Sequence, residues 1–383
     1  MAEDLPFDND KEQSNINVIR EIPDKRKYWF VRTYGGKLFD WFFEMGRVGI
    51  AGNTIPLKLI ADGIKDDVTF NALRTSVENN IEDTRAGAAT MLSRQLVNFY
   101  HKMNVGDIVM IPSDNSDYIA FGVVASDLIE NKKIKDTFLH NDRTESYPQR
   151  YRDVEWIKIM SKRDVVGDMR NLFATQMGLT NADKYADFIE GNISTFFQKD
   201  EYYYSSMFVD LNDDEELNAF ELYRYLEAVT KLYKHYCAVH GIEENEELYL
   251  KIKIQSQGNN IWKWLKAAGG TGVAAILGMS LVGSDPTVKI NKQEGFEASL
   301  KGNLFKNITE MYDNIVQTNI AKEEKELEIE NNKIDLINKK RELGLLTADE
   351  VEKYQIQLVD SAQQLQLKSI ESKEVDISEV ISN

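Results

Sequence analysis

Short apolar runs separated by turn-forming residues mark the region from Met103 to Trp156. One run ends at Ile111, the cluster Pro112–Asn115 follows, and apolar residues then alternate with small ones across 119–123. Alternation with a period of two is typical of strands, so this pattern predicts a hairpin of two core strands. A third strand is expected around Trp156. This order of turn, strand, loop and strand is typical of a small closed barrel.

Further elements are expected around this hairpin. Residues 27–33 form a β-prone run that ends at Gly35-Gly36, and a second strand is expected at 46–52, after an aromatic cluster. Apolar residues spaced three and four apart across 62–102 predict amphipathic helices. The polar segment 131–150 is a candidate binding loop, because a compact domain seldom keeps so long a loop without a use.

Capping signals predict helices farther along the chain. Ser161 with Asp164 resembles a capping box and predicts a helix that stops near Gly178, and a short helix is expected at 181–197. An apolar stripe rich in aromatic residues predicts a longer helix across 213–240.

An uncharged run between two expected strands leaves two interpretations open. The strands are expected at 248–254 and 287–302, and residues 267–284 lie between them with five glycines. With Trp262 and Trp264 as an interfacial belt, the run has the minimum length of a membrane span. Its modest apolarity favours a helix buried on a soluble sheet.

The C-terminal part of the chain is charged and helical in pattern. Ile320, Leu327 and Ile334 recur roughly in heptads within 303–372, which predicts a coiled-coil segment that joins copies of the chain. A solvated helix is the competing interpretation.

A capping box marks the last helix. Thr347 and Glu350 have the required spacing, and Gly344 suits the end of the preceding helix. Residues 341–370 resemble the short C-terminal helical modules that carry "GLLT-x-x-E" in many bacterial proteins and often mediate oligomerisation.

Composition narrows the class of protein. The 383 residues, 42% of them apolar, are enough for two or three domains with real cores. One cysteine, Cys237, excludes an internal disulfide framework and is typical of a reducing compartment. The acidic start has no apolar segment, so we expect no secretory signal and a cytoplasmic protein, membrane-associated if 267–284 inserts.

The net charge of −17 argues against a protein that coats nucleic acid. Between Arg26 and Asp200, however, 23 basic and 24 acidic residues nearly cancel. A near-neutral domain can present a local basic rim, and a solvated loop is the alternative. The candidates for such a rim are Lys132, Lys133, Lys135, Arg143, Arg150 and Arg152.

Three segments together carry a family resemblance. They are "WFVR…GG…F…GRVGIA", "MNVGDIVMIP…YIAFGVV" and "RYRDVEWIKIMSKRDV". Over residues 27–199 this order resembles the EVE-like branch of the PUA superfamily, including the modified-base reader domains fused to some bacterial restriction systems. The resemblance implies a compact barrel whose cleft accepts a nucleobase turned out of a duplex.

The candidate binding residues follow from that resemblance. A base out of its stack is held by aromatic faces, and the neighbouring phosphates by cations. The candidates are Trp29, Trp41, Tyr118 and Trp156 for stacking and Arg32, Arg150 and Arg152 for phosphates. For each aromatic residue taken singly, core packing is the commoner role.

Catalytic and metal-binding patterns are weak. His235, Cys237 and His240 lack a second pair of ligands, and the nuclease-like set around Glu155 lacks the strand-borne E-x-K spacing. "GGTG" at Gly269 lacks the Lys of a phosphate loop. We therefore expect no catalytic residue, metal or cofactor, and a binding protein more than an enzyme.

The sequence as a whole predicts an α+β protein. Its parts are an acidic arm (1–25), an EVE/PUA-like barrel with covering helices (26–200), a helix and strand region (201–302), a long-helix or coiled-coil segment (303–372) and a tail (373–383). The expected function is recognition of a modified or flipped base, in antiviral defence or regulation, by an oligomer. The alternative is a membrane-associated or oligomeric scaffold whose barrel binds a protein or small ligand.

Overall fold

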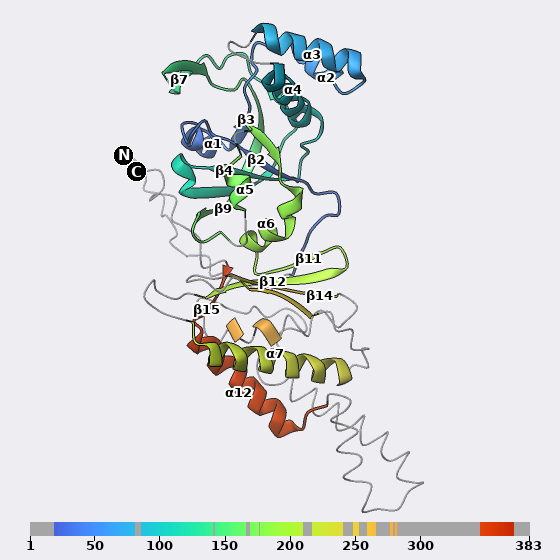
Figure 1. The fold of residues 1–383 in the computed structure, drawn as a ribbon, viewed down its shortest axis with the longest axis vertical. Helices are drawn as coiled ribbons and strands as arrows, with labels where there is room; N and C mark the ends of the chain where they lie inside the picture. The colour runs from blue at the N-terminus through green and yellow to red at the C-terminus, as the bar shows by residue number, and fades with distance from the viewer. Residues whose placement is uncertain are drawn as a thin grey trace, which may run out of the picture. The chain divides into compact units, whose positions relative to one another are not determined.

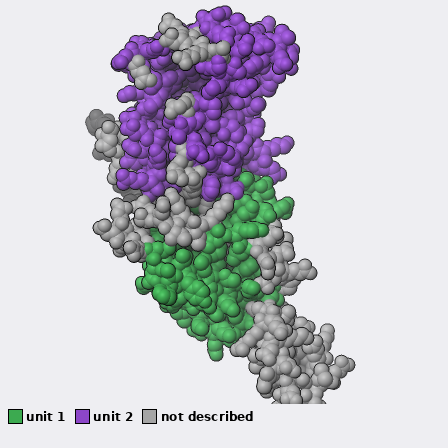
Figure 2. Space-filling view, in the orientation of Figure 1, with its two compact units in different colours: residues 1–22, 194–372 green, residues 23–193, 373–383 purple. Residues whose placement is uncertain are grey.

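The structure is a computed structural model, and it forms two compact units. It describes residues 19–80, 86–140, 142–165, 169–175, 177–209, 217–239, 248–252, 259–265, 276–278, 280–281 and 345–370. We call residues 23–193 the N-terminal unit, and residues 194–370 with 19–22 the C-terminal unit (Figure 2). The chain is mixed α and β, as the sequence predicts.

A curled sheet forms a half-barrel in the N-terminal unit (Figure 1). Its strand order is β10-β2-β4-β5-β9-β3, and β6 pairs with β9. Strands β2 and β4 run parallel, and the other neighbours run antiparallel. The strands are β2 (Tyr28–Val31), β3 (Arg47–Gly49), β4 (Ile108–Pro112), β5 (Tyr118–Val124), β6 (Ile129–Glu130), β9 (Arg150–Ser161) and β10 (Leu179–Asn181).

The predicted hairpin is confirmed. Strands β4 and β5 pair antiparallel from Ile108 opposite Val123 to Pro112 opposite Ile119. The tight turn before β4 is held by Asp107, whose carboxylate accepts hydrogen bonds from three groups. These donors are the backbone N–H groups of Lys27 and Asn104 and the indole N–H of Trp29.

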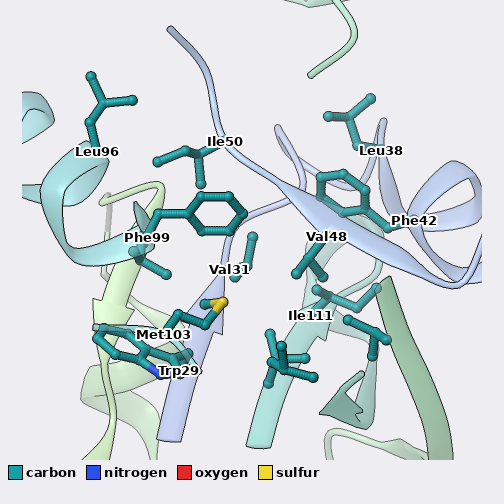
Figure 3. Close-up of a cluster of buried hydrophobic side chains, with 14 of the residues drawn as sticks. Trp29, Val31, Leu38, Phe42, Val48, Ile50, Leu96, Phe99, Met103 and Ile111 are labelled. Carbon is teal, nitrogen blue, oxygen red and sulfur yellow. The ribbon is translucent and has the colours of Figure 1, made fainter. Parts of the chain in front are cut away.

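Helices cover the half-barrel, and the sequence predicts the two that lie within 62–102. The helices are α2 (Leu57–Asp62), α3 (Asp67–Asn80) and α4 (Ala86–His101), and they gather at one end of the unit (Figure 1). Leu96 and Phe99 of α4 enter the core beside Trp29 and Val31 of β2 (Figure 3). The aromatic cluster before β3 forms a further helix, α1 (Phe39–Glu44).

Two predictions for this unit are wrong. Ser161 is not a helix cap, because β9 continues its pairing with β5 as far as Ser161. Among the described residues between Ser161 and Gly178, the only helix is α5 (Arg170–Phe173). Pairing with a neighbouring strand outweighs the local capping signal. The segment 131–150 is not an irregular loop, because it contains a two-stranded ribbon of β7 (Thr137–His140) and β8 (Arg143–Ser146). The short helix expected at 181–197 is present as α6 (Ala186–Ile193).

The C-terminal unit pairs a second sheet with two helices. The strand order is β1-β11-β12-β14-β13, with β15 paired to β12. Helices α7 and α12 pack against each other and contribute to the core of this unit. The elements are β1 (Arg20–Glu21), β11 (Phe196–Lys199), β12 (Tyr202–Val209), α7 (Ala219–Val239), β13 (Leu248–Ile252), β14 (Asn259–Leu265), α12 (Ala348–Gln364) and β15 (Leu367–Ser369).

The apolar run is described only in part. Trp262 is buried in strand β14, so it belongs to a sheet and not to an interfacial belt. Ile276, Leu277 and Leu281 are fully buried in the core of the C-terminal unit. No helix in the described ranges is long and apolar enough to cross a bilayer.

The predicted capping box is confirmed. Glu350 N–H donates to the Thr347 hydroxyl, and the Glu350 carboxylate accepts from the Thr347 N–H at 2.9 Å. The helix ends at Gln364, and residues 367–369 pair with β12 as a strand, whereas the sequence pattern predicts helix as far as Ile370. The strand expected at 287–302 and the heptads from Ile320 to Ile334 lie outside the described residues.

Candidate nucleic-acid interface

A continuous row of half-buried rings joins three parts of the N-terminal unit. The Trp41 ring of α1 lies 4.8 Å from Tyr147, and Tyr147 lies 5.2 Å from Phe138 of β7. Phe138 lies 5.2 Å from Tyr34, and Tyr34 lies 5.5 Å from His140. Tilted and edge-on contacts at these centroid distances are favourable for aromatic rings. We call these five residues the aromatic row.

Backbone strain positions Tyr34. Tyr34, Gly35 and Gly36 have φ values of 53°, 64° and 93°, and a bulky residue in this region is costly. Gly36 packs so closely against Asp114 that a Cβ atom would collide with the backbone of that residue. Burial, aided by the carboxylate of Glu145, raises the pKa of Tyr34 to about 12. Its hydroxyl is therefore neutral at physiological pH.

Asn53 fixes the chain at Tyr147, a residue of the aromatic row, and at Gln149. Its side-chain N–H donates to the Tyr147 carbonyl, and its side-chain oxygen accepts from the Gln149 N–H, both at 2.9 Å. The Gln149 side chain donates to the Ile134 carbonyl at 2.9 Å. The segment that carries Phe138 and Tyr147 is thus fixed at its base.

Arg150 fixes the turn that carries Asn53. Its guanidinium donates to the carbonyls of Gly52 at 3.0 Å and Ile55 at 2.6 Å, and to the Glu130 carboxylate at 2.8 Å. The same hydrogen bond holds the pKa of Glu130 below its ordinary value. Arg150 is buried and each of its three guanidinium nitrogens donates to one of these partners, so its placement suits a positioning residue more than the phosphate contact expected from the sequence.

Arg152 is likewise committed to the fold. It is 3% exposed, and its guanidinium donates to the Phe99 and Tyr100 carbonyls at the end of α4 and to the Ser126 carbonyl. A cation at a helix C-terminus satisfies carbonyls that have no partner within the helix. These hydrogen bonds hold the Arg152 guanidinium within the fold, so its placement suits a structural role more than the phosphate contact expected from the sequence.

Trp29 does not present a face to a ligand. It is 1% exposed and belongs to the core, with its indole N–H bonded to Asp107 at 2.9 Å (Figure 3). Tyr118 is half-buried against the same core. Arg32 continues the alternation of β2 on the face of Tyr28 and Phe30, opposite Trp29.

Trp156 packs against α1, the helix that carries Trp41. Trp156 is stacked on Phe43 of α1 at 5.5 Å, and its indole N–H points to the Phe42 carbonyl at 3.4 Å. A bulge in β9 opposite Gly122 turns Trp156 toward α1, and a side chain at Gly122 would collide with Trp156. Trp156 therefore contacts the helix that carries Trp41, and Trp41 is the one of the two that belongs to the aromatic row.

Arg47 is a candidate that the sequence pattern misses. Its guanidinium carbon lies 4.4 Å from the Tyr151 ring centroid and 5.3 Å from that of Trp41. Within the described chain its one hydrogen bond runs from Nε to the Met45 carbonyl at 3.3 Å. A half-buried guanidinium between two rings keeps donors available for an anion, and stacking holds it in place. The contact depends on the pairing of β3 with β9, which local sequence does not reveal.

The described residues of the histidine and cysteine pattern on α7 take part in hydrogen bonding and core packing. The His235 ring accepts a hydrogen bond from the Leu346 N–H at 3.0 Å, Cys237 is buried, and His240 lies outside the described residues. The described side chains contain no group of three metal-binding residues.

Comparison with known proteins adds one match. Residues 60–180 match a family described as a domain of unknown function, DUF8426. No curated protein and no solved structure matches the chain. The match covers α3, α4 and the central strands, and it includes the β7–β8 ribbon but neither Trp41 nor Arg47.

Proposed function

We propose that the N-terminal unit recognises nucleic acid without catalysis, by stacking a base on the aromatic row while Arg47 contacts the adjacent phosphate. The observation that carries this proposal is the Arg47 guanidinium held between Trp41 and Tyr151 beside that row. Stacking of a base on an aromatic side chain contributes about 1–3 kcal/mol and works for every base. The resemblance of residues 27–199 to EVE-like domains supports a modified or turned-out base as the ligand, and bacterial defence as the setting.

The competing interpretation is that these rings only seal the edge of the core. Aromatic pairs stabilise many small domains, and four of the five residues of the aromatic row pack against the buried core. The two interpretations differ in what loss of the Trp41 ring does. If the rings only cover the edge of the core, loss of the Trp41 ring lowers stability alone. If they form a binding surface, the loss also lowers the affinity of protein that remains folded.

Fluorescence anisotropy with labelled oligonucleotides tests the proposal. The full chain should bind in low salt and lose affinity as salt rises, because phosphate contacts release counterions. Trp41→Ala should weaken binding about tenfold, since about 1–3 kcal/mol of stacking is lost. Tyr249→Ala is the matched control, because Tyr249 is an exposed aromatic residue of β13 in the other unit. Absence of binding in low salt, or equal losses in the two variants, would contradict the proposal.

A second candidate function is assembly through the C-terminal unit. Three large apolar side chains of α7 and α12 are exposed, namely Phe220 at 81%, Tyr223 at 63% and Ile356 at 54%. Ile356 also lines an open groove of about 490 Å³ with Arg224, Lys353 and Glu352. Apolar groups beside charges of both signs suit contact with another copy of the chain. Ile356→Glu should then lower the mass seen by light scattering, and an unchanged mass would exclude this surface.

A further inference from the structure

The β7–β8 ribbon is a separate two-stranded sheet. Its pairing runs from Thr137 opposite Ser146 to His140 opposite Arg143, and it joins neither large sheet. Figure 1 shows β7 at the margin of the N-terminal unit. An isolated pair of strands is marginally stable, so this ribbon depends on other contacts for its order.

One face of the ribbon supplies those contacts. Phe138 and His140 are half-buried and lie in the aromatic row, and the Tyr147 N–H donates to the Asp136 carbonyl at 3.1 Å at the base of the ribbon. Since successive residues of a strand point to opposite faces, Thr137 and Leu139 lie on the other face. Both are exposed, and Leu139 is 63% exposed. Leu139 is therefore a large apolar side chain in solvent, close to the tip of a ribbon that is ordered through its opposite face.

Cations lie directly before the ribbon. Lys132, Lys133 and Lys135 are exposed, and Lys132 has a weak ion pair with Glu130 at 3.5 Å. Such lysines suit a phosphate backbone, which is bound mainly by Lys and Arg. A two-stranded ribbon also has the width that the major groove of a duplex admits.

We infer that the ligand of the proposed site is a duplex, and that Leu139 enters the base stack beside the base that turns out onto the aromatic row. Apolar side chains are inserted between base steps by several proteins that unstack a duplex. Leu139 would fill the space that the displaced base leaves, while Phe138 on the opposite face of the same ribbon contacts the row that receives it. This inference rests on the proposed function and adds the side chain that enters the duplex.

A pair of variants on the outer face tests the inference. The full chain and its Leu139→Ala variant are titrated against a duplex containing 2-aminopurine, whose fluorescence rises when the base next to it leaves the stack, and against the matching single strand. Thr137→Ala is the control, because Thr137 is exposed on the same face at the other end of β7. Substitution of exposed side chains leaves the fold intact, so the comparison reports binding.

The wild type and Thr137→Ala should raise the fluorescence of the duplex probe. Leu139→Ala should bind the duplex about tenfold more weakly with a smaller fluorescence rise, and bind the single strand within twofold of wild type. Equal duplex binding and fluorescence by Leu139→Ala and wild type would overturn the inference and leave the proposed function standing. Absence of wild-type binding to either form would overturn both.

Discussion

The Arg47 guanidinium carbon lies 4.4 Å from the centre of the Tyr151 ring, although the two residues belong to different strands. Arg47 is paired with Asp153 across β3 and β9, so Tyr151 is its diagonal neighbour on the same face. Trp41 approaches the same guanidinium from α1. Rings from two elements hold this guanidinium in place. Its positive charge is therefore available to a phosphate beside a stacked base.

Arg47 variants should separate charge from stacking. Arg47→Ala should lower the slope of log affinity against log salt by roughly 0.7–0.9, the value for one phosphate contact. Arg47→Lys keeps the charge and loses the planar contact with the rings, so its slope should match wild type at weaker affinity. Anisotropy between 50 and 200 mM salt measures both. Lys58→Ala, which removes an exposed cation of α2, is the control, and an equal change of slope in that variant would argue against a specific contact.

Gly36→Ala should destabilise the N-terminal unit. The positive φ and the collision with Asp114 together cost about 2–4 kcal/mol in the free energy of unfolding. Gly87→Ala is the matched substitution, because no atom lies within 4 Å of the added Cβ in α4. It should be neutral or stabilise by up to about 1 kcal/mol. Urea denaturation compares the two, and similar effects would show that the turn at Gly36 is not constrained.

Arg150→Met should cost about 2–4 kcal/mol of stability, because the Gly52 and Ile55 carbonyls lose their donor and Glu130 its main partner. Lys132→Met removes the other cation of Glu130, and that lysine side chain is 77% exposed. The control should cost less than about 1 kcal/mol, as exposed ion pairs do. Thermal unfolding measures both variants. A loss in Arg150→Met no larger than in the control would contradict the positioning role.

The free energy of unfolding should fall at alkaline pH, because the hydroxyl of Tyr34 loses its proton more readily in the unfolded chain than in the folded protein. Its pKa is raised from 10.0 to about 12, so the unfolded chain releases this proton first, and the stabilisation present below pH 10 is lost as pH rises toward 12. Relative to Tyr34→Phe, which has no proton to lose, the wild type should become less stable by roughly 1–2 kcal/mol over that interval. Urea unfolding at pH 9, 10 and 11 follows the difference. A constant difference between wild type and Tyr34→Phe over this interval would refute the prediction.

Thr347→Ala should destabilise the C-terminal unit by about 1 kcal/mol, because the Glu350 N–H loses its acceptor at the start of α12. Thr347→Ser keeps a hydroxyl and should retain most of that stability. Thermal unfolding followed by far-ultraviolet circular dichroism compares the two with wild type. Equal midpoints for all three would mean that the cap contributes nothing measurable.

The sequence by itself determined the local elements. An apolar run ended by turn-forming residues predicted β4, and alternation with a period of two predicted β5. Spacings of three and four predicted α3 and α4, and Thr347 with Glu350 predicted the start of α12. Each of these signals arises between residues a few positions apart, where backbone geometry and side-chain hydrogen bonds act within one element. The mixed α and β class follows from the same patterns.

Only the tertiary structure decided which side chains are available to a ligand. Trp29, Arg150 and Arg152 have the residue types of a nucleic-acid site, yet Asp107 and buried carbonyls from distant segments occupy their polar groups. Among the described residues, Arg47 donates only to the nearby Met45 carbonyl, and the pairing of β3 with β9 places its guanidinium over Tyr151. Exposure and partners depend on contacts between residues far apart in the chain, and the order of residue types along the sequence does not specify those contacts.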